Sequence, residues 1–146
     1  MSRSRFIAGL AGLAVLAMGG SAIAAVGPSI TSLKASQSGK SVVVKISTAY
    51  FTIDSKDVGK SPKAGKGHEH FALDGGKYDY PKYSGANGKL AKQLGVQGMY
   101  SPSVNNQVTY TGLPKGKHTI VVHLVKNNHS NYANKTATRK LTFTVR

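Results

Sequence analysis

Apolar residues alternate with polar ones in several short stretches of the chain, a pattern typical of β-strands that bury one face. No stretch after residue 25 keeps a helical period for long. We therefore expect an all-β, immunoglobulin-like antiparallel sandwich of six to seven short strands. The stretches that predict these strands are 30–33, 42–46, 50–53, 71–73, 108–110, 118–124 and 141–145.

One long interval, from Gly75 to Asn106, interrupts this rhythm and is rich in tyrosine and glycine. A connection of this length inside a compact domain is usually functional, so we interpret 75–106 as an insertion in the sandwich. Its tyrosines can either cover one end of the core or stack on sugar rings, and the first interpretation is favoured because tyrosine is an ordinary packing residue. These tyrosines are Tyr78, Tyr80, Tyr83 and Tyr100.

The first 24 residues have the three parts of a secretory signal peptide. Arg3 and Arg5 precede an apolar run from Phe6 to Met18, and an Ala-x-Ala exit follows, ending at Ala24. The run is too short and too rich in small residues to favour the alternative, an uncleaved membrane anchor. We expect cleavage after Ala24, a sandwich domain over residues 25–146, a secreted or periplasmic location and no membrane span after cleavage.

The charge is strongly one-sided, with 20 lysines and arginines against 5 acids and a net charge of +15. Removing Arg3 and Arg5 leaves 18 cations against 5 acids, a net of +13. Most of the cations are lysines spread along the chain, which suits attraction to anionic surfaces better than sequence-specific recognition of nucleic acid. The alternative is that the charge only keeps an exported protein soluble.

The chain has five histidines, and strand parity places four of them together. In an extended strand His68 and His70 share one face, while Glu69 points to the core. In an immunoglobulin-like sandwich the third and penultimate strands are antiparallel neighbours. If 67–73 and 118–126 are these strands, the exposed outer face brings His68 and His70 towards His123 and the loop residue His129.

His118 has inward parity and follows the turn that begins at Leu113, where related sandwiches place a corner tyrosine that bonds back to the loop. We interpret it as a structural hydrogen-bonding residue. The other four imidazoles suit copper or zinc, since calcium and magnesium prefer oxygen ligands. Asp54 and Asp74 are candidate acceptors for the second N–H of a ligating ring. The alternative is a set of exposed histidines that bind no metal.

Two blocks resemble a family of small exported bacterial domains of unknown function. The first is Gly67-His68-Glu69-His70 with Leu73-Asp74, and the second runs from Leu113-Pro114-Lys115-Gly116-Lys117-His118-Thr119 to Asn127-Asn128-His129. The resemblance implies an immunoglobulin-like fold outside the cytoplasm and suggests metal binding. The long insertion and His123 lie outside the shared pattern.

The sequence contains no nucleophile elbow, no phosphate-binding glycine loop and no paired carboxylates with acid-base spacing, so we expect no catalysis. Two functions from different classes remain. The first is a secreted or periplasmic domain that binds copper or zinc through His68, His70, His129 and His123. The second is a cationic envelope-associated or adhesion module that binds anionic cell-envelope polymers.

Overall fold

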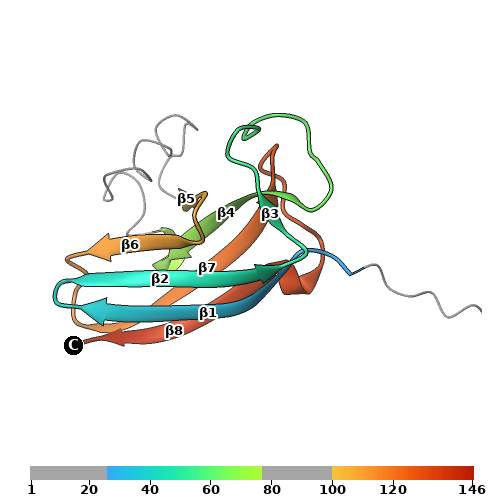
Figure 1. Ribbon diagram of the computed structural model, residues 1–146. Helices are drawn as coiled ribbons and strands as arrows, with labels where there is room; N and C mark the ends of the chain where they lie inside the picture. Colours follow the sequence, from blue (N-terminus) through green and yellow to red (C-terminus); the bar gives the residue numbers. More distant parts are fainter. Residues whose placement is uncertain (1–25, 77–99) are drawn as a thin grey trace, which may run out of the picture.

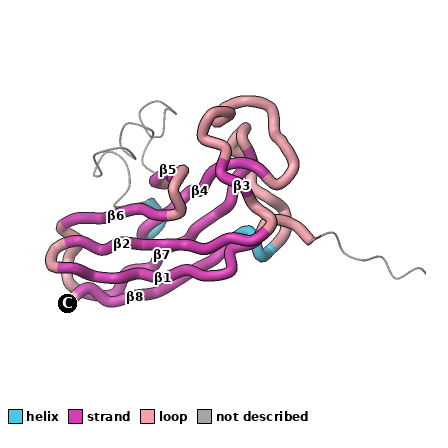
Figure 2. Tube along the Cα trace, viewed as in Figure 1, coloured by secondary structure: helices cyan, strands magenta, loops and turns pink. Residues whose placement is uncertain are grey.

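The computed structural model describes residues 26–76 and 100–146, which form an all-β sandwich (Figures 1 and 2). Two 3-10 turns, Asp74–Gly76 and Lys135–Ala137, accompany the strands. The strands are β1 (Ser29–Ser38), β2 (Ser41–Ala49), β3 (Thr52–Ile53), β4 (Lys66–Leu73), β5 (Ser101–Ser103), β6 (Gln107–Thr111), β7 (Gly116–Lys126) and β8 (Thr138–Val145).

The strands form two sheets, one with the order β1-β2-β6 and one with the order β3-β4-β7-β8, in which β5 also pairs with β4. All pairs are antiparallel except β3 with β4. The orders β1-β2-β6 and β4-β7-β8 correspond to strands A-B-E and C-F-G of the immunoglobulin sandwich. The predicted fold is thus confirmed. The very short strand β3 lies within the predicted stretch 50–53, and the described residues add one further short strand, β5; both lie along one edge of β4.

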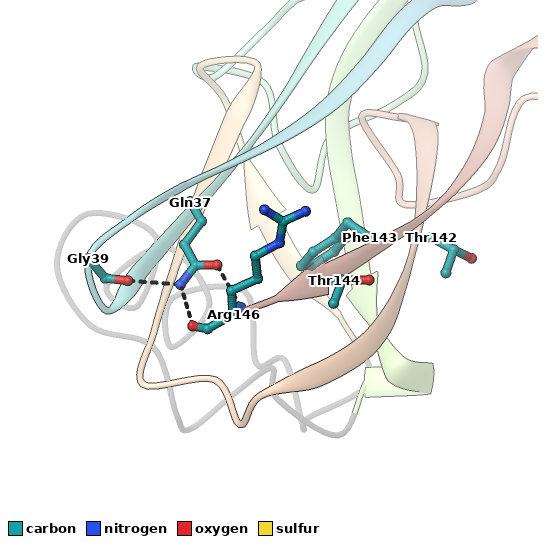
Figure 3. Close-up of a pocket in the computed structure, with 6 residues that line it drawn as sticks. All are labelled: Gln37, Gly39, Thr142, Phe143, Thr144 and Arg146. Atoms are coloured by element: carbon teal, nitrogen blue, oxygen red, sulfur yellow. Dashed lines mark hydrogen bonds between the residues drawn. The ribbon is translucent and has the colours of Figure 1, made fainter.

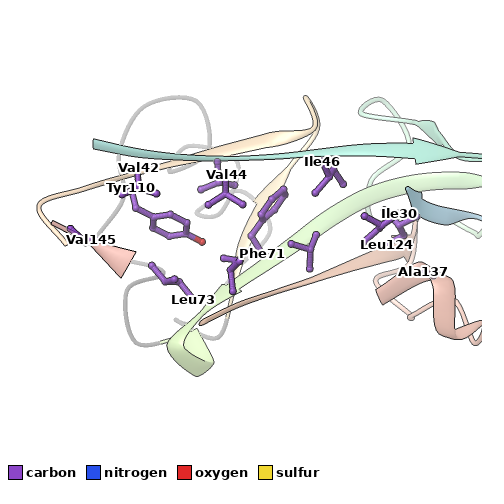
Figure 4. Packing of buried hydrophobic residues seen from close by; sticks show 13 residues of the cluster. Ile30, Val42, Val44, Ile46, Phe71, Leu73, Tyr110, Leu124, Ala137 and Val145 are labelled. Carbon is purple, nitrogen blue, oxygen red and sulfur yellow. The ribbon is translucent and has the colours of Figure 1, made fainter. Parts of the chain in front are cut away.

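The core lies between the sheets and is built by the alternation seen in the sequence (Figure 4). All members but Ala137, which ends the turn Lys135–Ala137, come from the inward-facing positions of the six longer strands, so each of these strands turns one row of side chains to the core. The buried cluster consists of Ile30, Val42, Val44, Ile46, Phe71, Leu73, Val108, Tyr110, Ile120, Val122, Leu124, Ala137 and Val145.

The two ends of the sandwich differ in what closes them. At one end the crossover loop between β3 and β4 lies beside the loop after β7, and the Gly59 N–H donates to the Asn127 carbonyl at 2.7 Å (Figure 1). At the other end the Gln37 amide ties β1 to Arg146, the residue that follows β8, since its Nε2 donates to the Arg146 carbonyl at 3.1 Å (Figure 3). A shallow groove lined by Thr142, Thr144 and Arg146 opens there.

Several sequence expectations concern residues outside the described part of the chain. The predicted signal peptide, residues 1–24, lies there, as do residues 77–99 of the predicted insertion. The ends of the insertion are described: it begins in the turn Asp74–Gly76 and returns through β5 to β6.

Candidate metal centre

His68 and His70 occupy alternate positions of β4 and point away from the core, as strand parity predicted. The predicted pairing is confirmed as well, since β4 and β7 run antiparallel from Gly67 opposite Lys126 to Leu73 opposite Ile120. The predicted exposure is wrong: His68 is 0% exposed and His70 is 8% exposed. Other parts of the chain therefore cover the outer face of the sheet at this point.

The loop after β7 supplies part of this cover and carries the third histidine. The His129 N–H donates to the Lys126 carbonyl at 2.9 Å, and the Lys126 N–H donates to the Ser130 carbonyl at 2.8 Å. These two hydrogen bonds close a turn that reverses the chain. Asn131 then pairs with Val125 in an isolated antiparallel bridge. His129 has a φ of 66°, a left-handed conformation in which histidine is enriched among non-glycine residues. This reversal brings the His129 ring back over β4.

The three rings meet through their nitrogens. His68 Nε2 lies 3.0 Å from His70 Nε2 and 3.2 Å from His129 Nδ1. One ligand atom from each residue lies within 4.8 Å of the other two. A tetrahedral ion with metal–nitrogen bonds of about 2.0 to 2.1 Å requires nitrogens separated by about 3.3 Å. The three nitrogens are therefore close enough together to bind one metal ion after small rotations of the rings.

Hydrogen bonds within the cluster cannot satisfy all of its ring nitrogens. A neutral imidazole has one N–H, so His68 can donate through Nε2 to only one of the two facing nitrogens. Its Nδ1 atom is buried and has no hydrogen-bond partner among the described residues. An ion at the meeting point would replace the nitrogen–nitrogen contacts with coordination bonds.

Burial keeps these rings neutral. Desolvation, with the neighbouring His129 as a smaller cause, lowers the pKa of His68 to about 4. Desolvation and three histidine neighbours lower the pKa of His70 to about 2. Burial also lowers the pKa of His129. Near neutral pH the lone pairs are thus available to a metal without competition from protons.

His123, the fourth predicted ligand, lies directly opposite His70 across the β4–β7 pair. Its Nδ1 atom shares a hydrogen bond of 2.9 Å with Thr138 Oγ1 on β8. The close group of ligand atoms comprises His68, His70 and His129 and does not include His123. The structure therefore places His123 beside the cluster.

Tyr100 is a member of the site that the sequence interpretation missed. Its ring stacks on His70, with centroids 3.6 Å apart and planes at 15°. The sequence favours tyrosines that cover one end of the core, whereas Tyr100 covers a histidine on the outer face. Burial raises its pKa. The only signal in the sequence was an aromatic residue just before β5.

Gly67, which precedes the histidine pair, is required by close packing of the two strands. A Cβ atom at this position would lie 1.8 Å from the Val125 carbonyl oxygen, far inside any real contact. The absence of a side chain therefore lets the beginning of β4 approach the end of β7, where the histidines converge. This explains the glycine of the Gly-His-x-His motif.

The two predicted acceptor carboxylates have other partners, so this expectation is wrong. Asp54 Oδ2 accepts from Asn127 Nδ2 at 3.2 Å. Asp74 Oδ2 lies 2.7 Å from His118 Nδ1, and Asp74 Oδ1 accepts from the Thr119 N–H at 2.7 Å. The positions of both acids follow from the turns that they close rather than from the histidine pair.

His118 has the structural role that its parity and position predicted. It is 4% exposed, and its Nε2 atom lies 2.8 Å from the Pro114 carbonyl of the preceding turn. With Asp74 on the other side, both ring nitrogens face oxygen atoms. This arrangement accounts for the histidine and the aspartate in the two sequence blocks.

Glu69 lies between His68 and His70 in the sequence but faces the core, and it is 0% exposed. Its Oε2 atom accepts from the Asn106 N–H at 3.3 Å, while Oε1 has no partner among the described residues. Desolvation raises the pKa of Glu69 to about 7. Because its side chain points to the opposite face of the sheet, this carboxyl group is not part of the histidine cluster.

In the described part of the chain, no helix is both long and apolar enough to cross a membrane. Comparisons with protein-family models, with curated proteins and with solved structures find no match to this chain.

Proposed function

We propose that this chain is a secreted or periplasmic domain that binds a transition metal, copper or zinc, without catalysing a reaction. The observation that carries the proposal is the convergence of His68, His70 and His129, whose ring nitrogens lie 3.0 and 3.2 Å apart in a buried site. Neutral imidazoles without thiolates suit these metals. The amino-terminal sequence pattern supports export.

Isothermal titration of the metal-free protein with zinc(II) and copper(II) tests the proposal. We expect the variant His68→Ala/His70→Ala to lose at least about 100-fold in affinity, since changes outside the ligand shell alone cost about 10- to 100-fold. His123→Ala is the matched control, because it removes a neighbouring histidine outside the close group. Equal affinity in the wild type and the double variant would contradict the proposal, provided circular dichroism shows that both are folded.

A second candidate function is adhesion to anionic envelope polymers, and one observation favours it. Strands β1, β2 and β6 contain no acidic residue. On the outer face of this sheet Lys34 lies directly opposite Lys45, an arrangement that costs stability between like charges. Both lysines line a shallow groove on this face, together with Ser36 and Val43. This face is therefore suited to attracting an anionic chain.

Retention on heparin as a function of salt tests this second candidate. Removing two cations from one binding face should lower the eluting salt concentration more than removing two cations elsewhere. We expect Lys34→Gln/Lys45→Gln to elute earlier than Lys117→Gln/Lys140→Gln, whose lysines are exposed on the other sheet. Identical elution of the two variants would show that only net charge matters.

A further inference from the structure

The ligand set in the histidine cluster consists entirely of neutral groups. Among residues 26–76 and 100–146, the close group holds three imidazoles and no carboxylate. The two acids nearest in sequence are engaged elsewhere, because Glu69 points to the core and Asp74 contacts His118 and Thr119. Asp54 likewise accepts from Asn127. An ion bound by these rings would therefore keep its full formal charge.

Because the site is buried, the charge of the ion decides how much free energy its binding costs. The free energy of moving an ion out of water rises with the square of its charge, so the cost is about fourfold larger for a divalent than for a monovalent ion of equal radius. His68 is 0% exposed and His70 is 8% exposed, so water provides little compensation. The net charge of +15 on the whole chain adds an unfavourable background. Both effects penalise a divalent ion more than a monovalent one.

The surroundings of His68 point the same way. A ligating imidazole usually donates its second N–H to a carboxylate or carbonyl, which strengthens the ligand and spreads the charge of the metal. With Nε2 on the metal, Nδ1 of His68 would carry the proton, and this atom has no partner in the described part of the chain. His68 therefore remains a plain neutral donor, which suits an ion of low charge.

Coordination number supplies a third reason. Zinc(II) in proteins is almost always four-coordinate, so three imidazoles leave its fourth position to a water, and a site this buried gives water little room. Monovalent copper has a filled d shell and is satisfied by two or three donors. Imidazole is a ligand that copper accepts. We propose, building on the metal-binding function above, that the His68–His70–His129 cluster selects copper(I) over zinc(II) and copper(II).

Competition titrations of the full chain test this selectivity. Copper(I) is measured under anaerobic conditions against a chromophoric copper(I) chelator, and zinc(II) and copper(II) against chelators of known affinity at the same pH. We expect a dissociation constant for copper(I) at least about 100-fold lower than that for either divalent ion. If zinc(II) or copper(II) binds at least as tightly as copper(I), and replacing His129 weakens the binding of each ion equally, the selectivity is refuted and the metal-binding function stands. Failure of all three ions would refute both proposals.

A charge substitution tests the physical cause. His123 lies opposite His70 on the same face, so His123→Glu adds a carboxylate beside the cluster, and His123→Gln is the neutral control. We expect His123→Glu to reduce the preference for copper(I) over zinc(II) by at least about tenfold relative to His123→Gln, since a nearby negative charge favours the divalent ion more. An unchanged ratio of the two affinities would refute the charge argument.

Discussion

The strand pair β4–β7 has a buried histidine site at each end, and the two sites differ in their hydrogen-bond partners. At one end both ring nitrogens of His118 lie within 2.8 Å of an oxygen, one from Asp74 and one from Pro114. At the other end His68 faces two further imidazole nitrogens and leaves its Nδ1 atom without a partner. Burial is similar, so the supply of oxygen acceptors is what distinguishes a structural histidine from a candidate ligand.

The same contrast extends beyond the histidines. Three buried side-chain atoms have no hydrogen-bond partner among the described residues, namely His68 Nδ1, Glu69 Oε1 and Asn127 Oδ1. All three lie where β4 begins and β7 ends. Buried polar atoms are nearly always paired in folded proteins, and violations concentrate at functional sites. The unpaired buried atoms that lower the stability of the fold are therefore at the same end as the histidine cluster.

The largest expected effect is a difference in the free energy of unfolding between two variants, each with one histidine replaced at one end of the β4–β7 pair. His118→Leu leaves the Asp74 carboxylate without its buried partner, and we expect a loss of about 2 to 4 kcal/mol in the free energy of unfolding. His68→Leu removes a poorly satisfied polar group, so its cost in metal-free protein should stay below about 1 kcal/mol. Urea unfolding with a chelator present measures both. Equal losses would abolish the distinction between the two sites.

Glu69→Gln tests the buried carboxyl group, one oxygen of which has no partner among the described residues, through its pH dependence. The folded state raises the pKa of Glu69 from 4.5 to about 7, so this group favours folding at low pH and loses that contribution as pH rises from 4.5 to 7. Glutamine does not titrate, so the variant should gain stability relative to the wild type over this interval, reaching about 2 to 3 kcal/mol above pH 7.

The neighbouring histidines act in the opposite direction on the pH dependence. The pKa of His68 is lowered from 6.5 to about 4, so its contribution to stability is lost as pH falls through this range. This loss is shared by wild type and Glu69→Gln, and it cancels in their difference. A difference that stays constant from pH 4 to 8 in thermal unfolding would contradict the shift at Glu69.

Gly67→Ala probes the close approach that builds the cluster. The added methyl group meets the Val125 carbonyl, so the strands must separate there, and we expect a loss of about 1 to 3 kcal/mol with weaker metal binding. Gly27→Ala is the control, since its Cβ would meet only the Asn134 side chain, at 3.3 Å. Similar behaviour of both variants in thermal unfolding would show that the approach is not critical.

Strand alternation, together with the strand order of the immunoglobulin sandwich, was sufficient to predict the fold, the antiparallel pairing of β4 with β7 and the convergence of His68, His70 and His129. The prediction also included His123, which lies beside the close group. Alternation was insufficient for the burial of that face, because the cover depends on the left-handed turn at His129 and on Tyr100, which enters from the insertion. Neither feature follows from a period of two. Strand β5 was not predicted either, since its three residues are too few to show alternation.

His68 and His129 are 61 positions apart in the sequence, and the chain contains no cysteine. A metal bound by both would close that loop as a disulfide does, restricting the unfolded chain. In the loop-entropy treatment of cross-links, a loop of this length corresponds to about 4 kcal/mol. Unlike a disulfide, this link would open when the metal is withdrawn. Metal supply would then control the resistance of the domain to unfolding, the role that oxidation plays in disulfide-linked exported proteins.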